Sequence, residues 1–209
     1  MASTLSNFPN VPYNHRYRWP VSEYPIDRIS NAVYFARWLL RAGWKLPPIC
    51  AVLGNWQAES YLNTNYPQRE DFPTSTGGGF GLPHWTPWYD KYGQWAYDTY
   101  GLTATATDDN PLADFALQME YHEYSITQGE WFPNQGYSFS WSGFKLAEDQ
   151  TIDTLTRAYY WQYERSASGD PDRRVDYALW YRDFFADNPI TPLPADIPIW
   201  LLFKIKNRR

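Results

Sequence analysis

Prolines gather near both ends of this chain, and their distribution limits what it can fold into more than any other feature. Proline fixes φ and lacks a backbone N–H, so closely spaced prolines disfavour helix interiors and central strands. The clustered residues are Pro9, Pro12, Pro20 and Pro25, then Pro189, Pro192, Pro194 and Pro198. We therefore predict an extended arm over residues 1–26, a folded body over 27–188, and a linker with an apolar, basic-ended tail over 189–209.

Within the body, apolar residues recur at the three- and four-residue spacing of buried helix faces. Proline in a first turn, preceded by a capping Asn or Asp, marks several helix starts, and glycine marks a stop. A run of glycines between the second and third helices fits a tight turn or hairpin. The predicted fold is mainly α (α+β): a helical domain with a small β-hairpin. Helices are expected over about 27–42, 47–60, 111–122, 152–163 and 171–188, and the glycine-rich turn over 74–81.

Charge and rare residues argue against several classes of protein. A net charge of −5, from 18 basic and 23 acidic residues, disfavours nucleic acid and anionic membranes as partners. Cys50 is the sole cysteine and the three histidines lack HExxH spacing, so we predict no internal disulfide, no metal and no cofactor. The apolar run at 199–203 is far shorter than the roughly 20 residues of a transmembrane helix. Residues 1–10 lack the pattern of a signal peptide, so we expect neither a transmembrane segment nor a leader.

Aromatic residues make up 20% of the chain, with 12 Trp, 18 Tyr and 11 Phe. Such rings supply large apolar area to a core, while Tyr and Trp keep a polar group. Rings that line a groove also stack on the C–H faces of sugars. The composition therefore permits both a ring-filled core and a ring-lined sugar site.

Glu59 stands out on the second expected helix. At about 100° per residue it lies at the margin of the apolar stripe formed by Ile49, Leu53 and Trp56, and near the helix C-terminus. Partial burial and the negative end of the helix dipole should both raise its pKa. A carboxylic acid that stays protonated near neutral pH is suited to general acid catalysis of glycosidic cleavage. The alternative is a solvated glutamate at a helix end.

Three motifs, in order, resemble the phage tail lysozyme family over roughly residues 28–187. Residues 53–60, Leu-Gly-Asn-Trp-Gln-Ala-Glu-Ser, resemble the family's GN…ES helix. Residues 79–86, Gly-Phe-Gly-Leu-Pro-His-Trp-Thr, resemble its glycine-rich hairpin and G-(aliphatic)-x-Q-W-T strand. Tyr163-Glu164-Arg165, followed by Arg174 and Ala178, resembles its YER…R…A ending.

The resemblance implies a lysozyme-like fold that cleaves the β-1,4 bond between N-acetylmuramic acid and N-acetylglucosamine in peptidoglycan. Glu59 falls where the family keeps its catalytic acid, and the hairpin would form the opposite wall of a sugar cleft. The expected substrate-binding residues are Asn55, His84, Trp85, Thr86 and Tyr163. Tyr163 could also hydrogen-bond Glu59. His84 replaces the family's usual Gln and follows Pro83, and Thr64 stands where a Pro often occurs, so the first change affects the expected substrate preference.

Lysozyme chemistry usually needs a second carboxylate. Asp71, in the loop that enters the glycine-rich segment, is the primary candidate, and Glu70 and Asp90 are rivals. A lytic transglycosylase would need only the single Glu59, so retaining, inverting and transglycosylase chemistry stay open. Glu164 and Arg165 are interpreted as a structural ion pair.

Two further classes remain. Cys50, with His84 or His122 as base, could act as a cysteine peptidase on the peptide stems of the wall. A catalytically inactive wall-binding or structural tail module is the other. The expected partners are peptidoglycan and other phage tail proteins docked through the arm or tail. The expected location is the phage virion tail, or the cell wall after release from the host.

Overall fold

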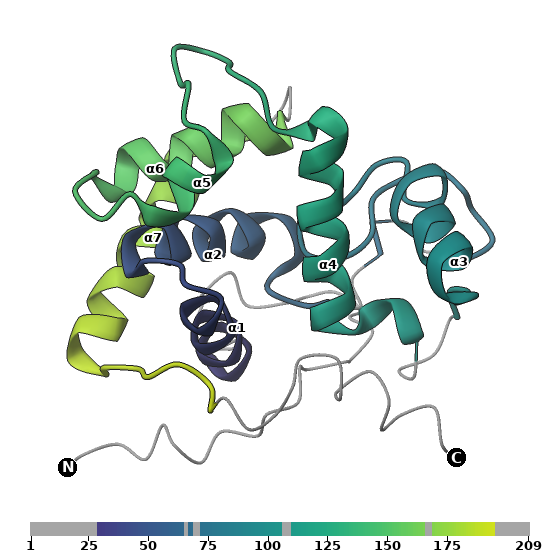
Figure 1. Ribbon diagram of the computed structural model, residues 1–209, viewed down its shortest axis with the longest axis horizontal. Coiled ribbons are helices and arrows are strands. Elements are labelled where there is room, and N and C mark those ends of the chain that lie inside the picture. The colour runs from purple at the N-terminus through teal and green to yellow at the C-terminus, as the bar shows by residue number, and fades with distance from the viewer. Residues whose placement is uncertain (1–28, 65–66, 69–71, 106–109, 166–168, 195–209) are drawn as a thin grey trace.

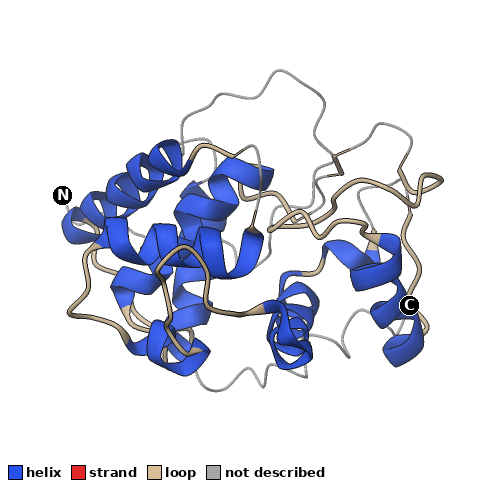
Figure 2. Ribbon diagram, turned by 90° about the horizontal axis from the view of Figure 1, so that it is seen from above, coloured by secondary structure: helices blue, strands red, loops and turns tan. Residues whose placement is uncertain are grey.

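The computed structural model describes residues 29–64, 67–68, 72–105, 110–165 and 169–194. This part of the chain is mainly helical (Figure 1) and contains no regular strand (Figure 2). None of its helices has the length and apolarity to cross a membrane. The predicted arm and the apolar tail lie outside the described ranges.

The α-helices are α1 (Ile29–Arg41), α2 (Leu46–Ser60), α3 (Gln94–Tyr100), α4 (Phe115–Ser125), α5 (Trp141–Leu146), α6 (Ile152–Tyr159) and α7 (Pro171–Asp187). Shorter turns are η4 (Pro111–Ala113), of 3₁₀ type, and η3 (Tyr89–Gly93), η5 (Ile126–Glu130) and η6 (Tyr160–Glu164), of π type.

The helices with clear start and stop signals form where they are predicted. Gly43, at φ 88°, follows α1, and α2 has proline in its first turn. Asp170 caps α7 by accepting hydrogen bonds from the backbone N–H groups of residues 172 and 173. The helix expected from Pro111 is interrupted instead, because the Asp114 side chain accepts from the Leu117 N–H and starts α4 there. Helices α3 and α5 were not predicted, since seven or six residues are too few to show a periodic pattern.

The predicted β-hairpin is not confirmed. Phe80 makes isolated bridges to Pro67 and Trp85, but no ladder forms among the described residues. Gly78, Gly81 and His84 all have positive φ, at 82°, 81° and 49°. Because the chain turns every few residues, no extended stretch is long enough for regular pairing. The segment is a compact loop packed beside α4.

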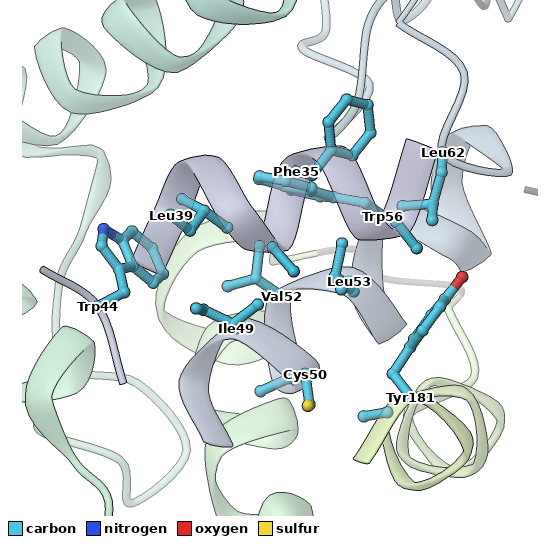
Figure 3. Packing of buried hydrophobic residues seen from close by; sticks show 14 of the residues in the cluster. Phe35, Leu39, Trp44, Ile49, Cys50, Val52, Leu53, Trp56, Leu62 and Tyr181 are labelled. Atoms are coloured by element: carbon cyan, nitrogen blue, oxygen red, sulfur yellow. The ribbon is translucent and has the colours of Figure 1, made fainter. Parts of the chain in front are cut away.

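Helix α2 is the centre of the main core, and its residues 48–57 are buried on every side (Figure 3). Trp56 meets Phe35 of α1 and Phe115 of α4 edge-on, at ring separations of 6.3 and 6.4 Å. The Trp56 indole N–H donates to the Tyr159 hydroxyl of α6 at 3.0 Å. A helix that is apolar all round must be enclosed by other elements, and here α1, α4, α6 and α7 enclose it.

A second, smaller aromatic core lies beneath the glycine-rich loop and around α3. Phe72 and Phe80 stack at 4.7 Å, and Trp85 packs against Tyr92 and Tyr121 at 4.9 and 5.0 Å. Helix α4 joins the two cores: its Phe115 and Met119 belong to the main one, while its Leu117 and Tyr121 belong to the second. The C-terminal end of α2, which carries Glu59, lies next to α4 (Figure 1).

Gly54 allows α2 and α7 to approach closely. A Cβ at this position would lie 2.5 Å from the Arg174 carbonyl oxygen and 2.7 Å from the Ala178 Cβ. We expect Gly54→Ala to lower the free energy of unfolding by about 1–3 kcal/mol, because overpacking outweighs the better helix propensity of alanine. Denaturant unfolding measures this. Gly77→Ala is the control, since a Cβ there meets nothing within 4 Å; equal stability of the two variants would contradict the close approach.

Candidate active site

A cleft of about 260 Å³ opens between the two cores. Its lining comes from the end of α2, the glycine-rich loop, α4 and the three π-helical turns. A π turn widens the helix by one residue and often occurs at functional sites. Here η3 supplies Lys91, η5 supplies Glu130, and η6 supplies Tyr163 and Glu164. The lining residues are Glu59, Gln68, Pro83, His84, Trp85, Thr86, Lys91, Tyr121, Ser125, Glu130, Tyr163, Glu164 and Arg165.

Glu59 lies in this cleft, with its side chain 18% exposed. Arg174 Nη2 donates to Glu59 Oε1, and His84 Nδ1 lies 3.4 Å from Oε2. Burial raises the pKa of Glu59, but His84 and Arg174 outweigh burial and lower this pKa to about 2. The expectation that its pKa is raised is therefore wrong for the free protein, because α7 brings a guanidinium to it from 115 residues away.

Arg174 joins two carboxyl groups. Its side chain is 4% exposed, and its Nη1 donates to Glu164 Oε2, whose side chain is 2% exposed. The predicted Glu164–Arg165 ion pair is wrong: Arg165 turns away at φ 53° and donates to Glu130. Burial raises the pKa of Glu164 despite the neighbouring Arg174.

Asn55 lies behind the cleft and not in its lining. It is fully buried, and its amide donates to the carbonyl groups of Ala51 and Thr156 at 2.9 and 3.1 Å. Its Oδ1 accepts from Arg174 Nη1 at 3.2 Å. The structure therefore does not support substrate contact by Asn55. The residue holds Arg174 in place.

His84, Trp85 and Thr86 line the cleft together. The Thr86 hydroxyl donates to the His84 carbonyl at 2.8 Å and is on the exposed side. Trp85 is only 7% exposed, and its indole N–H donates to the Tyr163 hydroxyl at 2.8 Å. That hydroxyl also bonds Ser125 Oγ at 2.9 Å, so the predicted Tyr163–Glu59 hydrogen bond does not form. Trp85 and Tyr163 therefore line the cleft as largely buried rings whose polar groups are already hydrogen-bonded.

Gln118 of α4, which was not predicted, fixes the glycine-rich loop. It is fully buried; its Oε1 accepts from the Leu82 N–H at 3.1 Å, and its amide donates to the Thr64 carbonyl at 2.7 Å. Gly81 lies so close that a Cβ there would be 3.0 Å from Gln118 Oε1. One amide thus ties the chain after α2 and the glycine-rich loop to the same helix.

Of the candidate second carboxylates, Asp71 and Glu70 lie outside the described residues. Asp90 is exposed and does not line the cleft. Glu130 does line it, and it was missed because no periodic pattern or motif includes it. Glu130 pairs with Lys91 and Arg165, and although burial raises its pKa, these two cations lower it overall.

Cys50 is unsuited to nucleophilic catalysis. Cys50 is fully buried in the main core, and burial raises the pKa of its thiol to about 12. A cysteine nucleophile needs an accessible thiolate. The cysteine peptidase alternative is therefore wrong. Among the described residues, no cluster of three or more His, Cys, Asp or Glu is arranged to hold a metal ion.

Comparison with known proteins identifies the family of this chain. Residues 30–185 match the sequence profile described as phage tail lysozyme. The chain belongs to this family. It is also 30% identical over 153 residues to Morphogenesis protein 1 of Bacillus phage B103. That alignment covers 73% of this chain and 38% of the relative, so the chain spans well under half of that protein's length. The phage tail lysozyme match covers the helices and loops that build the cleft, and it confirms the resemblance inferred from the three motifs.

Proposed function

We propose that this phage tail lysozyme cleaves the β-1,4 glycosidic bond between N-acetylmuramic acid and N-acetylglucosamine in peptidoglycan, with Glu59 as general acid. One observation carries the proposal: Glu59 lies within the family's GN…ES motif and also reaches the cleft with a partly exposed carboxyl group. The other two described carboxyl groups of the cleft are less suitable. Glu164 is almost wholly buried, and Glu130 is bound to two cations.

In the proposed reaction, a glycan strand lies in the cleft with its glycosidic oxygen next to Glu59. Glu59 gives its proton to that oxygen as the bond to C1 breaks, and the carboxylate left behind stabilises the positive charge that develops on the sugar. A water molecule, or the C6 hydroxyl of the muramic acid in the transglycosylase reaction, then bonds C1 and gives its proton back to Glu59. His84 and Thr86 are proposed to hydrogen-bond the sugar, and Trp85 and Tyr163 to contact its apolar face. Because Glu59 is ionised in the free protein, substrate binding must favour its protonated form.

A lytic transglycosylase is the second candidate, and the state of the other carboxyl groups favours it. Glu130 and Glu164 are both engaged with cations, so neither described group is available to activate water. Single-acid chemistry closes a 1,6-anhydro ring on the muramic acid and needs no such base. If Asp71 supplies the second carboxylate, hydrolysis follows instead.

Family membership associates the protein with a phage. We propose that it opens the wall locally during infection, as part of the virion tail, with release of progeny as the alternative. The arm over 1–26 and the tail over 189–209 are proposed to dock on other tail proteins. The start of this last segment packs on α1, where the Leu193 N–H donates to the Arg37 carbonyl at 3.2 Å.

Digestion of purified peptidoglycan, followed by mass spectrometry of the fragments, tests the activity. We expect disaccharide muropeptides with reducing N-acetylmuramic acid ends from the wild-type protein. Anhydro ends would establish the transglycosylase instead, and cut peptide stems would contradict both. No soluble product from several chemotypes of wall would indicate a lysozyme fold retained for wall binding or tail assembly.

A further inference from the structure

Two carboxyl groups share one guanidinium at the inner side of the cleft. Glu59 from α2 and Glu164 from η6 each accept a hydrogen bond from Arg174, one on each terminal nitrogen. Arg174 and Glu164 are 4% and 2% exposed at the side chain, so water screens this pair weakly. The guanidinium also lies over the Tyr160 ring, 4.8 Å from its centroid, which leaves it little room to move.

The charges of this triad do not balance when both glutamates are ionised. With His84 neutral, two carboxylates and one guanidinium leave one net negative charge in a buried cluster, which is costly. A single proton on either glutamate makes the cluster neutral. Glu164 Oε1 is buried and has no hydrogen-bond partner among the described residues. An ionised oxygen in that position would lack a donor within the described part of the chain, so the proton is expected on Glu164 in the free protein.

We propose that Glu164 stores the proton that Glu59 delivers: the two carboxyl groups share one proton, which resides on Glu164 in the free protein and on Glu59 when a glycan fills the cleft. The exchange breaks one O–H bond and forms another, and whichever glutamate is ionised neutralises Arg174. Net charge is unchanged. The role rests on the proposed function, and it makes Glu164 a positioning residue, since it acts through Arg174 and Glu59.

Glycan binding supplies the driving force. Glu59 is 18% exposed, so a bound sugar removes water from it and disfavours its ionised form. Glu164 is already buried and loses little further hydration. The proposed place of the proton in the free protein agrees with opposite pKa shifts of the two glutamates. Burial raises the pKa of Glu164, whereas His84 and Arg174 lower the pKa of Glu59 although burial opposes them.

Other ionisable groups surround the triad. His84 faces Glu59 from the glycine-rich loop, and in its protonated form it would hold Glu59 ionised. Tyr159, on α6, interacts electrostatically with both Glu164 and Arg174, and burial raises its pKa well above the ordinary value, so it stays neutral. Across the cleft, Glu130 is bound to Lys91 and Arg165 in a separate cluster with one net positive charge.

Carbon-13 NMR titration of the glutamate carboxyl groups tests the shared proton without any catalysis. We expect one carboxyl group of the wild-type protein to titrate well above the usual range of glutamate. That high titration should be lost in Glu164→Gln, because the group that carries the proton is absent. It should also be lost in Glu59→Gln, because Glu164 then becomes the sole counter-ion of Arg174 and ionises. A high titration that persists in Glu59→Gln, or that is absent from the wild type, would overturn the proposal. Saturation with chitotetraose should raise the pKa of Glu59. A pKa of Glu59 that is the same with and without the sugar would overturn the proposed exchange.

The pH dependence of wall cleavage provides the second readout. In Glu164→Gln, Glu59 alone must neutralise Arg174, so we expect the rate at pH 7 to fall at least about 10-fold and to recover as the pH is lowered. Glu164→Asp, which keeps a carboxyl group, should restore part of the rate. Glu148→Gln is the matched control, because Glu148 pairs with Lys45 on the surface. An unchanged pH profile in Glu164→Gln would contradict the role, whereas a wild type without cleavage would contradict the proposed function and leave the NMR test intact.

Discussion

Replacement of Glu59 by glutamine is expected to lower the rate of peptidoglycan cleavage by about 10²- to 10⁴-fold, the usual contribution of a general acid. The amide has no proton acidic enough to protonate the leaving oxygen. Its carbonyl can still accept from Arg174 Nη2, and Glu164 can ionise to balance the charge. Stability should therefore change little. The rate of release of soluble muropeptides measures the effect.

The same substitution on the surface, Glu148→Gln, controls for the loss of one negative charge. Thermal unfolding of both variants separates an effect on chemistry from an effect on the fold. A Glu59→Gln protein that cleaves peptidoglycan at the rate of the wild type would show that Glu59 is not the acid. It would also favour the interpretation of this region as a wall-binding surface.

Replacement of Arg174 by methionine should lower the free energy of unfolding by about 3–5 kcal/mol at pH 7, the typical cost of breaking a buried ion pair. The change deprives Glu59 and Glu164 of their shared guanidinium, and it removes the donor to Asn55 Oδ1. Denaturant unfolding at pH 7 measures the loss. At pH 5 the loss should be smaller, because a carboxylate without its cation takes up a proton more readily.

Arg182→Met is the matched control on the same helix. Arg182 is 50% exposed at the side chain and pairs with its neighbour Asp183, so its loss should cost less than about 0.5 kcal/mol. Equal losses for the two variants would mean that the triad contributes no more than a surface ion pair. Arg174→Lys should recover only part of the stability, because an ammonium group lacks the planar fork that reaches both carboxyl groups.

The helices that could be predicted are those whose start and stop residues lie close to their ends in the sequence. Helices α1, α2 and α7 are marked by glycine, proline or a capping Asp within a few residues of their ends, and these local signals were sufficient. The helix expected from Pro111 was misjudged because Asp114, a second cap, competes with it. Helices α3 and α5 are short, and their packing rather than their own sequence stabilises them. The hairpin was inferred from glycines that in fact turn the chain too often to form a ladder.

For the candidate site, motifs predicted which residues line the cleft but not which side chains contact one another. Glu59, His84, Trp85, Thr86 and Tyr163 all line the cleft, and each lies in a motif that can be read along the chain. Motifs carry no information on which side chains meet across the fold. The Tyr163 hydroxyl bonds Trp85 and Ser125 instead of Glu59, and Asn55 supports Arg174 from behind.

The sequence by itself determined the family, the helical class and the place of Glu59 on α2, because these depend on local spacing and on motifs. Only the tertiary structure decided the charge of Glu59. His84 of the glycine-rich loop faces Glu59, the Gly54 contact brings α7 against α2 so that Arg174 also reaches Glu59, and the π turn η6 carries Glu164 to the same guanidinium. A pKa is set by burial and by charges within a few ångströms. Residues 59, 164 and 174 become neighbours only after the chain has folded.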